Sequence, residues 1–299
     1  MIGQALGGLV SGGVYAALGV TVVFMYRMLG VVNFAQAGIG AMGGTVGLIL
    51  YTAGWDAISS VAIGLLAGCI LAAVIGWIMA TVFLEDTVEL KSTVTIGIFV
   101  AMLAAGNYIL GGSVHSFPDL LGDASVNLSG IGIPLGSIAE CLGAILLAVG
   151  LGALLKYTPM GLDLRALAAR PVTAQLMGIR VVPLTIAVWV ASGFISTLAI
   201  MLVLNMSTNA FSPMASLIVP ALAAALLGLF RSMTITALAG IVLGIVQSLL
   251  LTVQVGPASL GPLAMGSISL GRYNNALPFL LIIVVLMWWR RKDVWADAR

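Results

Sequence analysis

The chain has 299 residues, of which 61% are hydrophobic and 7% are charged, with a formal net charge of +2 and a mean hydropathy of +1.20. A soluble domain carries about a quarter charged residues. This composition therefore lacks the polar surface that a soluble enzyme, a nucleic-acid-binding protein or a disordered scaffold needs. A bilayer permits only helices or closed barrels, and the apolar runs here are continuous rather than alternating. The sequence predicts an all-α polytopic membrane protein.

A membrane-spanning helix needs about 20 mostly apolar residues, and nine segments approach this requirement. In chain order they are Gly3–Tyr26, Val32–Tyr51, Ala57–Leu84, Ser92–Leu110, Leu135–Leu155, Leu184–Asn205, Ala215–Phe230, Met233–Val253 and Asn275–Trp289. The second and seventh are short, polar or Gly-rich, so we expect them to be half-crossing or broken helices. The prediction is a single transmembrane domain over residues 1–299, with eight or nine transmembrane or partly crossing helices.

The basic residues predict the orientation of the chain. If all nine segments cross and the C-terminus is cytoplasmic, 11 of the 12 Lys and Arg residues lie on the cytoplasmic side and only Arg272 lies outside. The 11 are Arg27, Lys91, Lys156, Arg165, Arg170, Arg180, Arg231, Arg290, Arg291, Lys292 and Arg299. Positive charge accumulates in cytoplasmic loops, so we expect the N-terminus outside. The first segment lacks a basic n-region and a cleavage site, which indicates a retained span rather than a signal peptide.

Two loops are long enough to bind partners. The outer loop, 111–134, contains the single histidine, His115, with Asp119, Asp123 and Asn127, and we expect a surface loop with short strands. The inner loop, 156–183, holds four basic residues and one acid. The two loops suggest partners on both sides of the membrane.

Motifs for enzyme chemistry are absent from the sequence. There is no GxxxxGK[ST] phosphate-binding loop, no GxSxG nucleophile motif, and one histidine cannot form HExxH. Cys69 and Cys141 lie inside apolar runs, where we interpret them as buried thiols rather than a disulfide. The acids, His115 and the cysteines show no spacing typical of a metal site. We therefore expect a chain that is not an enzyme and binds no metal or cofactor itself.

The polar residues inside the predicted spans are uncharged, with Glu140 as the main exception. A proton-coupled carrier usually places Asp, Glu or His at mid-membrane, and ion channels show charged rings or carbonyl filters. Glu140 lies about five residues into the fifth segment, roughly 8 Å along a helix, so we expect it near the outer interface, hydrated or hydrogen-bonded. This pattern disfavours ion coupling and predicts an external energy source.

Asn33 and Gln36 are three residues apart and share one helical face. Their amides either line a translocation path or bind across helices, and both interpretations stay open. The same two interpretations apply, with a stronger lean to helix contacts, to Asn107, Asn205, Asn209 and Gln247. The pairs Gly40-xxx-Gly44 and Gly43-xxx-Gly47 predict close helix packing, next to the possible path.

The inner loop contains a short apolar helix that should bind a partner. Pro171 suits the first helical turn, and Gly178 suits the position just after the helix. Between them, Val172, Leu176 and Met177 lie on or near one side. This helix is too short to cross a membrane and too apolar to stay in water, so we expect it to dock in a partner's groove or to lie on lipid.

Three motifs then occur in order along nearly the whole chain. Residues 12–19 (GGVYAALG) precede residues 31–38 (VVNFAQAG), the stretch from Gly161 through Arg165-Ala166 reaches residues 174–179 (AQLMGI), and residues 286–295 read LMWWRRKDVW. Together they resemble the permease subunit of branched-chain amino acid ABC transporters, of the leucine-transport-system type.

The resemblance implies a bacterial inner-membrane importer with several subunits. Its implied partners are a second homologous permease, two ATP-binding subunits that carry ATP and Mg, and an extracytoplasmic substrate-binding protein, with no nucleic acid. The expected translocation-path residues are Asn33, Gln36, Gly40 and Gly44. The residues expected to couple to the ATPase are Arg165, Pro171, Val172, Leu176, Met177 and Gly178.

Other functions remain compatible with an uncharged path. A permease of the same family for urea, short amides or small carboxylates is one alternative. A standalone secondary carrier or channel is the second, and a membrane subunit that serves assembly without transport is the third.

Overall fold

The computed structural model describes residues 2–110, 125–128, 131–203, 211–251, 254–255, 268–269, 274 and 276–297. The helices within this part are α1 (Ile2–Leu29), α2 (Gln36–Thr52), α3 (Ala57–Thr81), α4 (Val88–Leu110), α5 (Leu135–Tyr157), α6 (Pro159–Ala169), α7 (Pro171–Leu176), α8 (Val181–Val203), α9 (Phe211–Ser216), α10 (Ile218–Leu227), α11 (Met233–Leu250) and α12 (Leu277–Asp297). Two antiparallel pairs of short strands accompany them: β1 (Ser125–Leu128) with β2 (Ile131–Pro134), and β3 (Gln254–Val255) with β4 (Ile268–Ser269). The predicted all-α membrane fold is confirmed.

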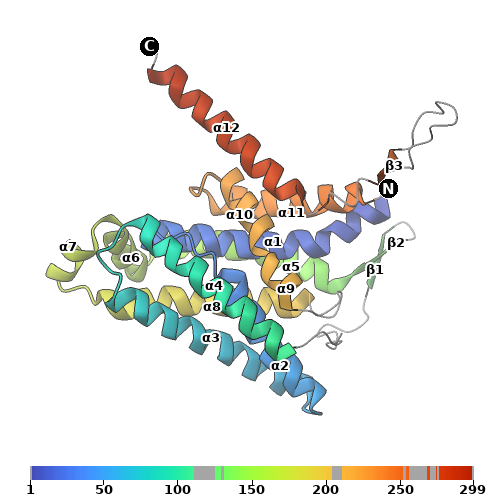
Figure 1. The fold of residues 1–299 in the computed structure, drawn as a ribbon, viewed down its shortest axis with the longest axis horizontal. Helices are drawn as coiled ribbons and strands as arrows, with labels where there is room; N and C mark the ends of the chain where they lie inside the picture. Colours follow the sequence, from blue (N-terminus) through green and yellow to red (C-terminus); the bar gives the residue numbers. More distant parts are fainter. Residues whose placement is uncertain are drawn as a thin grey trace.

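Six helices in the described part of the chain are long and apolar enough to cross a membrane, namely α1, α3, α4, α5, α8 and α11. Two shorter apolar stretches, Phe211–Leu227 and Leu277–Met287, accompany them. The long helices lie alongside one another along one common direction (Figure 1). The protein is a multi-pass membrane protein.

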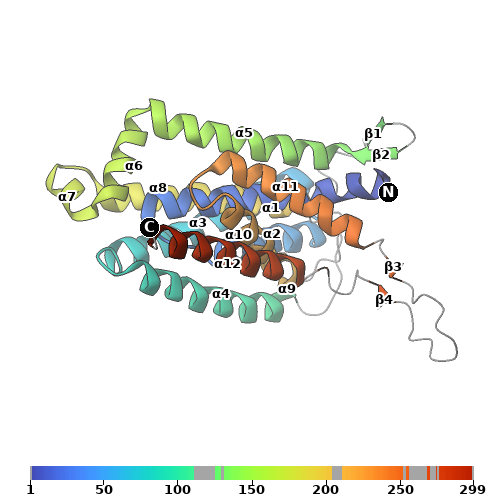
Figure 2. The same ribbon diagram turned by 90° about the horizontal axis from the view of Figure 1, so that it is seen from above.

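Helix α1 forms the centre of the bundle and contacts α5, α8, α10 and α11 (Figure 2). Its closest neighbour is α11, where small residues allow the backbones to meet. A Cβ added at Gly240 would lie 2.5 Å from the backbone nitrogen of Ala16, and one at Gly8 would lie 2.6 Å from the carbonyl oxygen of Gly244. Transmembrane helices associate through such small-residue contacts, because lipid supplies little hydrophobic force between them.

Helices α2, α3 and α8 form a second group that packs in the same way. A Cβ at Gly40 would lie 2.6 Å from the carbonyl oxygen of Ser196, and one at Gly43 would lie 2.9 Å from that of Gly64. Gly44 is also buried on α2. The predicted small-residue packing is therefore confirmed at Gly40 and Gly43. Helix α4 then packs against α2 and α9.

Of the two segments predicted to be half-crossing or broken, the seventh is divided, whereas the second is a short continuous helix, α2, that follows a non-helical stretch. Helix α1 ends before Gly30, whose φ of +65° is a conformation that glycine adopts easily, and α2 begins only at Gln36. The seventh segment consists of α9 and α10, separated at Leu217. After α10 the chain turns back into α11, and the Phe230 ring in this turn lies 4.9 Å from that of Tyr26 near the end of α1.

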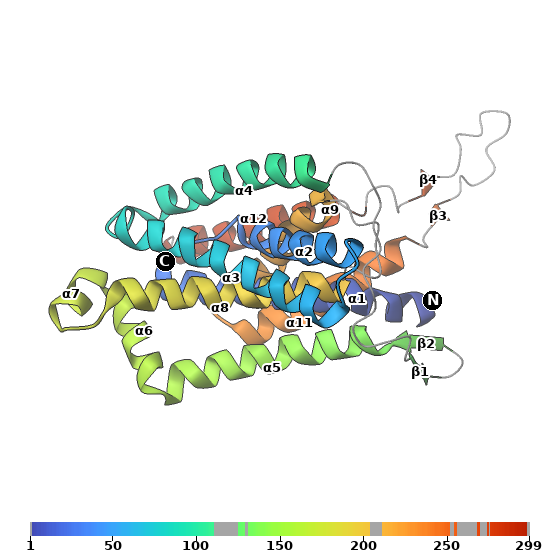
Figure 3. The same cartoon turned by 90° about the horizontal axis from the view of Figure 1, so that it is seen from below.

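The molecule has two distinct ends (Figures 1 and 3). The α7 end comprises α6 and α7 with the last turn of α1 and the first turn of α4. The β1 end comprises β1 and β2 with the start of α1 and the end of α11. Helix α12 runs toward the α7 end (Figure 2). In the described part of the chain from Arg27 to Arg231, the Lys and Arg residues lie in turns, near helix ends or on α6, at the α7 end.

The two long loops differ from each other in structure. In the outer loop, β1 and β2 confirm the expected short strands, whereas His115, Asp119 and Asp123 lie outside the described residues. The inner loop contains two helices: α6, where Leu164, Leu167 and Ala168 fall at helical spacing, precedes the short helix α7. Thr158 caps the start of α6, since its Oγ1 accepts a hydrogen bond from the Gly161 nitrogen over 3.0 Å, and Pro159 is the first residue of the helix.

Candidate functional site

The non-helical stretch between α1 and α2 is held by hydroxyl groups of α4. The backbone nitrogen of Phe34 donates to Thr95 Oγ1 over 3.1 Å, and that of Val32 donates to Ser92 Oγ over 3.4 Å. Thr95 Oγ1 also bonds to the Val32 carbonyl oxygen over 3.3 Å. Backbone groups inside a membrane must find partners within the protein. These bonds allow an extended segment to persist between two helices.

Asn33 and Gln36 lie side by side at the start of α2, and both are fully buried. Asn33 Nδ2 donates to Gln36 Oε1 over 2.8 Å, and Asn33 Oδ1 accepts from the Ala35 nitrogen over 3.0 Å. Gln36 Nε2 reaches α8, where it bonds to the Ser192 carbonyl oxygen over 2.9 Å and to Ser196 Oγ. The two amides therefore connect α2 to α8.

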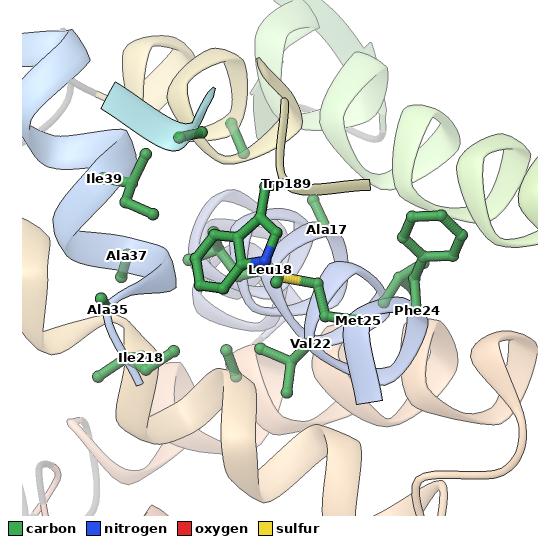
Figure 4. Packing of buried hydrophobic residues seen from close by; sticks show 14 of the residues in the cluster. Ala17, Leu18, Val22, Phe24, Met25, Ala35, Ala37, Ile39, Trp189 and Ile218 are labelled. Carbon is green, nitrogen blue, oxygen red and sulfur yellow. The ribbon is translucent and has the colours of Figure 1, made fainter. Parts of the chain in front are cut away.

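The thioether of Met25 completes this buried polar cluster. Its sulfur accepts from Asn33 Nδ2 over 3.4 Å and from Ser192 Oγ over 3.2 Å. Figure 4 shows Met25 among the buried residues of α1, with the indole nitrogen of Trp189 pointing toward it. In this conformation the amides link helices, and the centre of the bundle is closed by hydrogen-bonded side chains without formal charge. Their role in a translocation path remains a prediction.

A cavity of about 520 Å³ lies between α1, α9, α10, α11 and α12. Its polar lining comes from Tyr15, Ser212, Ser216 and Gln247, and its other lining residues are Leu217, Val219, Pro213, Pro220, Pro278 and Phe279. The lining is thus uncharged. Gln247 Nε2 donates to the Asn274 carbonyl oxygen over 3.2 Å, so Gln247 joins α11 to the stretch that precedes α12.

The other amides predicted to contact helices are only partly described. Asn107 Nδ2 donates to Ser212 Oγ over 2.9 Å and its Oδ1 accepts from the same hydroxyl over 3.0 Å, which joins α4 to α9. The helix-contact interpretation is confirmed for Asn107. Asn205 and Asn209 lie outside the described residues.

Glu140 is buried, so the hydrated alternative of its prediction is wrong, whereas a hydrogen bond from its second carboxylate oxygen stays a prediction. Its side chain is 5% exposed, and among the described residues its Oε1 has no hydrogen-bond partner. The burial of Glu140 depends on α1, because Gly13 of that helix lies next to Glu140. A Cβ at Gly13 would lie 2.9 Å from the Glu140 Cβ. Because Gly13 has no side chain, α1 and α5 can approach closely enough to bury Glu140 between them. Both cysteines are free thiols and half-buried, and Cys141 Sγ donates to the Leu9 carbonyl oxygen over 3.3 Å.

The predicted end of the short loop helix matches the structure closely. Gly178 has a φ of +86°, its nitrogen donates to the Gln175 carbonyl oxygen, and the Ile179 nitrogen donates to that of Ala174. This pair of bonds is the Schellman arrangement that ends many helices. Pro171 is the first residue of α7, as predicted.

The apolar side of α7 faces outward. Leu176 is 84% exposed and Met177 is 76% exposed, with Val172 also exposed. Helix α7 lies at the extreme of the α7 end (Figure 1). Large apolar side chains presented together mark interaction surfaces. Arg165 instead folds back on its own helix, with Nε donating to the Gly161 carbonyl oxygen over 3.3 Å.

Several residues of the polar cluster escape prediction from sequence. Ser192 and Ser196 are one turn apart on α8, and Ser92 and Thr95 are one turn apart on α4. Their spacing is the only signal, and it is shared by many hydroxyl pairs that bond to their own helix. Within the described part of the chain, no group of three or more His, Cys, Asp or Glu residues lies close enough to hold a metal ion.

Comparisons with known proteins identify the family. No curated protein matches the chain in sequence. A solved structure, PsaBC from Streptococcus pneumoniae in complex with Fab, aligns over 95% of this chain and 90% of its own, with 15% identity and a TM-score of 0.48. The family described as "Branched-chain amino acid transport system / permease component" matches residues 4–286. Because this match covers nearly the whole chain, the protein belongs to that family of ABC transporter permeases and is a transporter subunit.

Proposed function

We propose that the protein forms the translocation path of an ATP-driven importer for branched-chain and other hydrophobic amino acids. The observation that carries this proposal is the uncharged lining of the closed centre and of the 520 Å³ cavity. The Asn33–Gln36 cluster and the 520 Å³ cavity offer amides, hydroxyls and apolar surface without a formal charge. A zwitterion of no net charge with an apolar side chain suits such a lining, because polar groups orient it and apolar groups bury its side chain.

Energy for import comes from partner subunits in this proposal. Two ATP-binding subunits carry ATP and Mg, a second homologous permease completes the path, and an extracytoplasmic binding protein delivers substrate at the β1 end. The positive charge near the α7 end supports a cytoplasmic location for that end in a bacterial inner membrane. The N-terminus then lies outside and the C-terminus in the cytoplasm.

Helix α7 is the proposed contact with the ATP-binding subunits. Leu176 and Met177 supply exposed apolar side chains, and the ordered ends at Pro171 and Gly178 keep the helix rigid. The α6 helix anchors it, because Leu164 and Leu167 are buried against the bundle. Movement of the ATP-binding subunits would thereby reach α8 and the polar cluster that α8 forms with α2.

Reconstitution of the complete transporter tests this function. Proteoliposomes that contain all subunits are expected to accumulate radiolabelled leucine only when ATP is hydrolysed. Uptake of radiolabelled urea, acetamide and acetate is measured in the same proteoliposomes, because these solutes represent the alternative substrates within the family. Preferred uptake of one of these solutes would refute the substrate class. Leucine uptake by this chain alone, driven by a gradient without ATP, would instead support a standalone carrier.

A further inference from the structure

A second, smaller cavity of about 200 Å³ lies at the α7 end, where residues of six helices meet. Its walls include Met28 near the end of α1, Met79 near the end of α3, Lys91 in the first turn of α4, Leu167 and Pro171 from α6 and α7, and Thr185 on α8. It is distinct from the 520 Å³ cavity, which is lined by α9 to α12 and α1. Its volume suits a small solute, since cavities for drug-sized ligands measure about 300–1,000 Å³.

Three hydrogen-bond donors of this cavity have unused capacity: the Lys91 ammonium, the Thr185 hydroxyl and the indole nitrogen of Trp189, which is buried and has no hydrogen-bond partner among the described residues. The Lys91 ammonium donates to the Leu84 carbonyl oxygen over 2.8 Å, and an ammonium has three N–H groups. Thr185 is only 4% exposed, yet its Oγ1 has no hydrogen-bond partner among the residues that the structure describes. A threonine hydroxyl in a helix can bond to a carbonyl of the preceding turn. A buried hydroxyl without a partner costs free energy, which indicates that something else bonds to Thr185.

The residues that line the cavity favour a ligand that carries a negative charge and has a small apolar part. It contains one cation and no acid, and its remaining side chains are chiefly apolar. Asp86 interacts electrostatically with Lys91 but does not line the cavity. Trp189 also lines the cavity, and its indole nitrogen points toward Met25 (Figure 4). An anion with a short apolar body matches this surface, whereas the ammonium of a free amino acid would face no acid here.

We propose that this cavity, which we call the α7-end cavity, binds a short aliphatic monocarboxylate. The carboxylate bonds to the ammonium of Lys91 and the hydroxyl of Thr185, and the apolar body packs on Met79 and Trp189. Pro171, the first residue of α7, belongs to the same wall, so an occupant contacts the helix proposed to meet the ATP-binding subunits. This inference does not depend on which solute is transported.

Equilibrium binding of radiolabelled isovalerate to the full chain in phosphatidylcholine nanodiscs tests the proposal. Saturable binding is expected, with isovaleramide, the neutral isostere, at least about tenfold weaker because a charge-assisted bond is lost. Leucine should also be weaker. The comparison of isovalerate with isovaleramide uses the unchanged protein, so it stands even if a variant fails to fold.

Variants then assign the binding residues. Lys91→Gln should weaken isovalerate binding by about tenfold or more, and Thr185→Val by a few-fold. Lys156→Gln is the matched control, since Lys156 lies at the α7 end over the Tyr157 ring but outside the cavity lining. Equal binding of isovaleramide or leucine, or full binding by Lys91→Gln, would overturn the proposal. It would also fall if isovalerate did not bind and phosphatidylglycerol stabilised the wild type through Lys91, because a lipid phosphate would then be the ligand.

Discussion

Asn33 and Gln36 form a direct hydrogen bond of 2.8 Å at the point where the extended stretch after α1 becomes helix α2. Gln36 in turn donates hydrogen bonds to Ser192 and Ser196 on α8. Helix α8 begins three residues after Gly178, which caps α7. A continuous physical connection thus runs from the exposed face of α7, along α8, to the closed centre of the bundle.

Replacement of Gln36 by Ala should weaken this connection. The Ser196 hydroxyl and the Asn33 amide would lose a partner inside the protein, which typically costs about 1–3 kcal/mol. We expect a lower thermal unfolding midpoint in detergent and slower ATP-driven uptake. Asn107→Ala is the control, because its amide bonds to Ser212 at an exposed site. Unchanged uptake in a folded Gln36→Ala variant would show that the cluster only supports structure.

Thr95 should matter more than its neighbour Thr93. Thr95→Val leaves the nitrogen of the partly buried Phe34 without its acceptor, at a cost of up to about 1–3 kcal/mol. In Thr93→Val the lost bond is an exposed one to the Glu89 carbonyl of the same helix, so little change is expected. Amide hydrogen exchange at Phe34 measures the difference. Equal protection in both variants would mean that Thr95 does not hold the extended stretch.

The close contact between α1 and α11 predicts that a Gly-to-Ala substitution lowers stability at this contact but not at an open position on another helix. In Gly240→Ala the new methyl group would meet the Ala16 backbone, and the helices must separate. Such overpacking costs about 1–3 kcal/mol. Gly150→Ala on α5 is the matched control, because nothing lies within 4 Å of the added Cβ. Thermal unfolding of the two purified variants should differ, and equal midpoints would contradict this packing.

Sequence alone predicts the helical architecture well, because each membrane-spanning helix requires a long run of apolar residues. The breaks before Gln36 and around Leu217, and the cap at Gly178, also follow from local residue types. The partners of Gln36 could not be predicted, since Ser192 lies 156 residues away. The burial of Glu140 was missed for a related reason: it depends on Gly13 of another helix, and single-helix periodicity carries no such information.

Glu140 offers a test between energy sources. Glu140→Gln keeps the shape of the side chain and removes its ability to ionise. An ATP-driven importer is expected to retain uptake within about twofold, because coupling does not use an ionisable group in the membrane. Uptake assays on the reconstituted transporter measure this directly. A loss of uptake with normal ATP hydrolysis would point to proton coupling through Glu140.

Leu176→Asp tests the proposed docking of α7. The side chain is almost fully exposed in the single chain, so the variant should fold normally. Placing a carboxylate in an apolar groove of the ATP-binding subunit should cost several kcal/mol of association. Leu176→Met is the control, since it conserves volume and apolar character. Co-purification of ATP-binding subunits from mild detergent measures the effect, and normal recovery with Leu176→Asp would remove α7 from the interface.

The most direct test of the account is a pull-down of the tagged chain from its native membrane in mild detergent, with ATPase assay and mass spectrometry of the recovered subunits. We expect two ATP-binding subunits, a second hydrophobic permease and ATP hydrolysis in the same complex. Recovery of this chain alone, without ATPase activity, would contradict the role of an ATP-driven importer subunit.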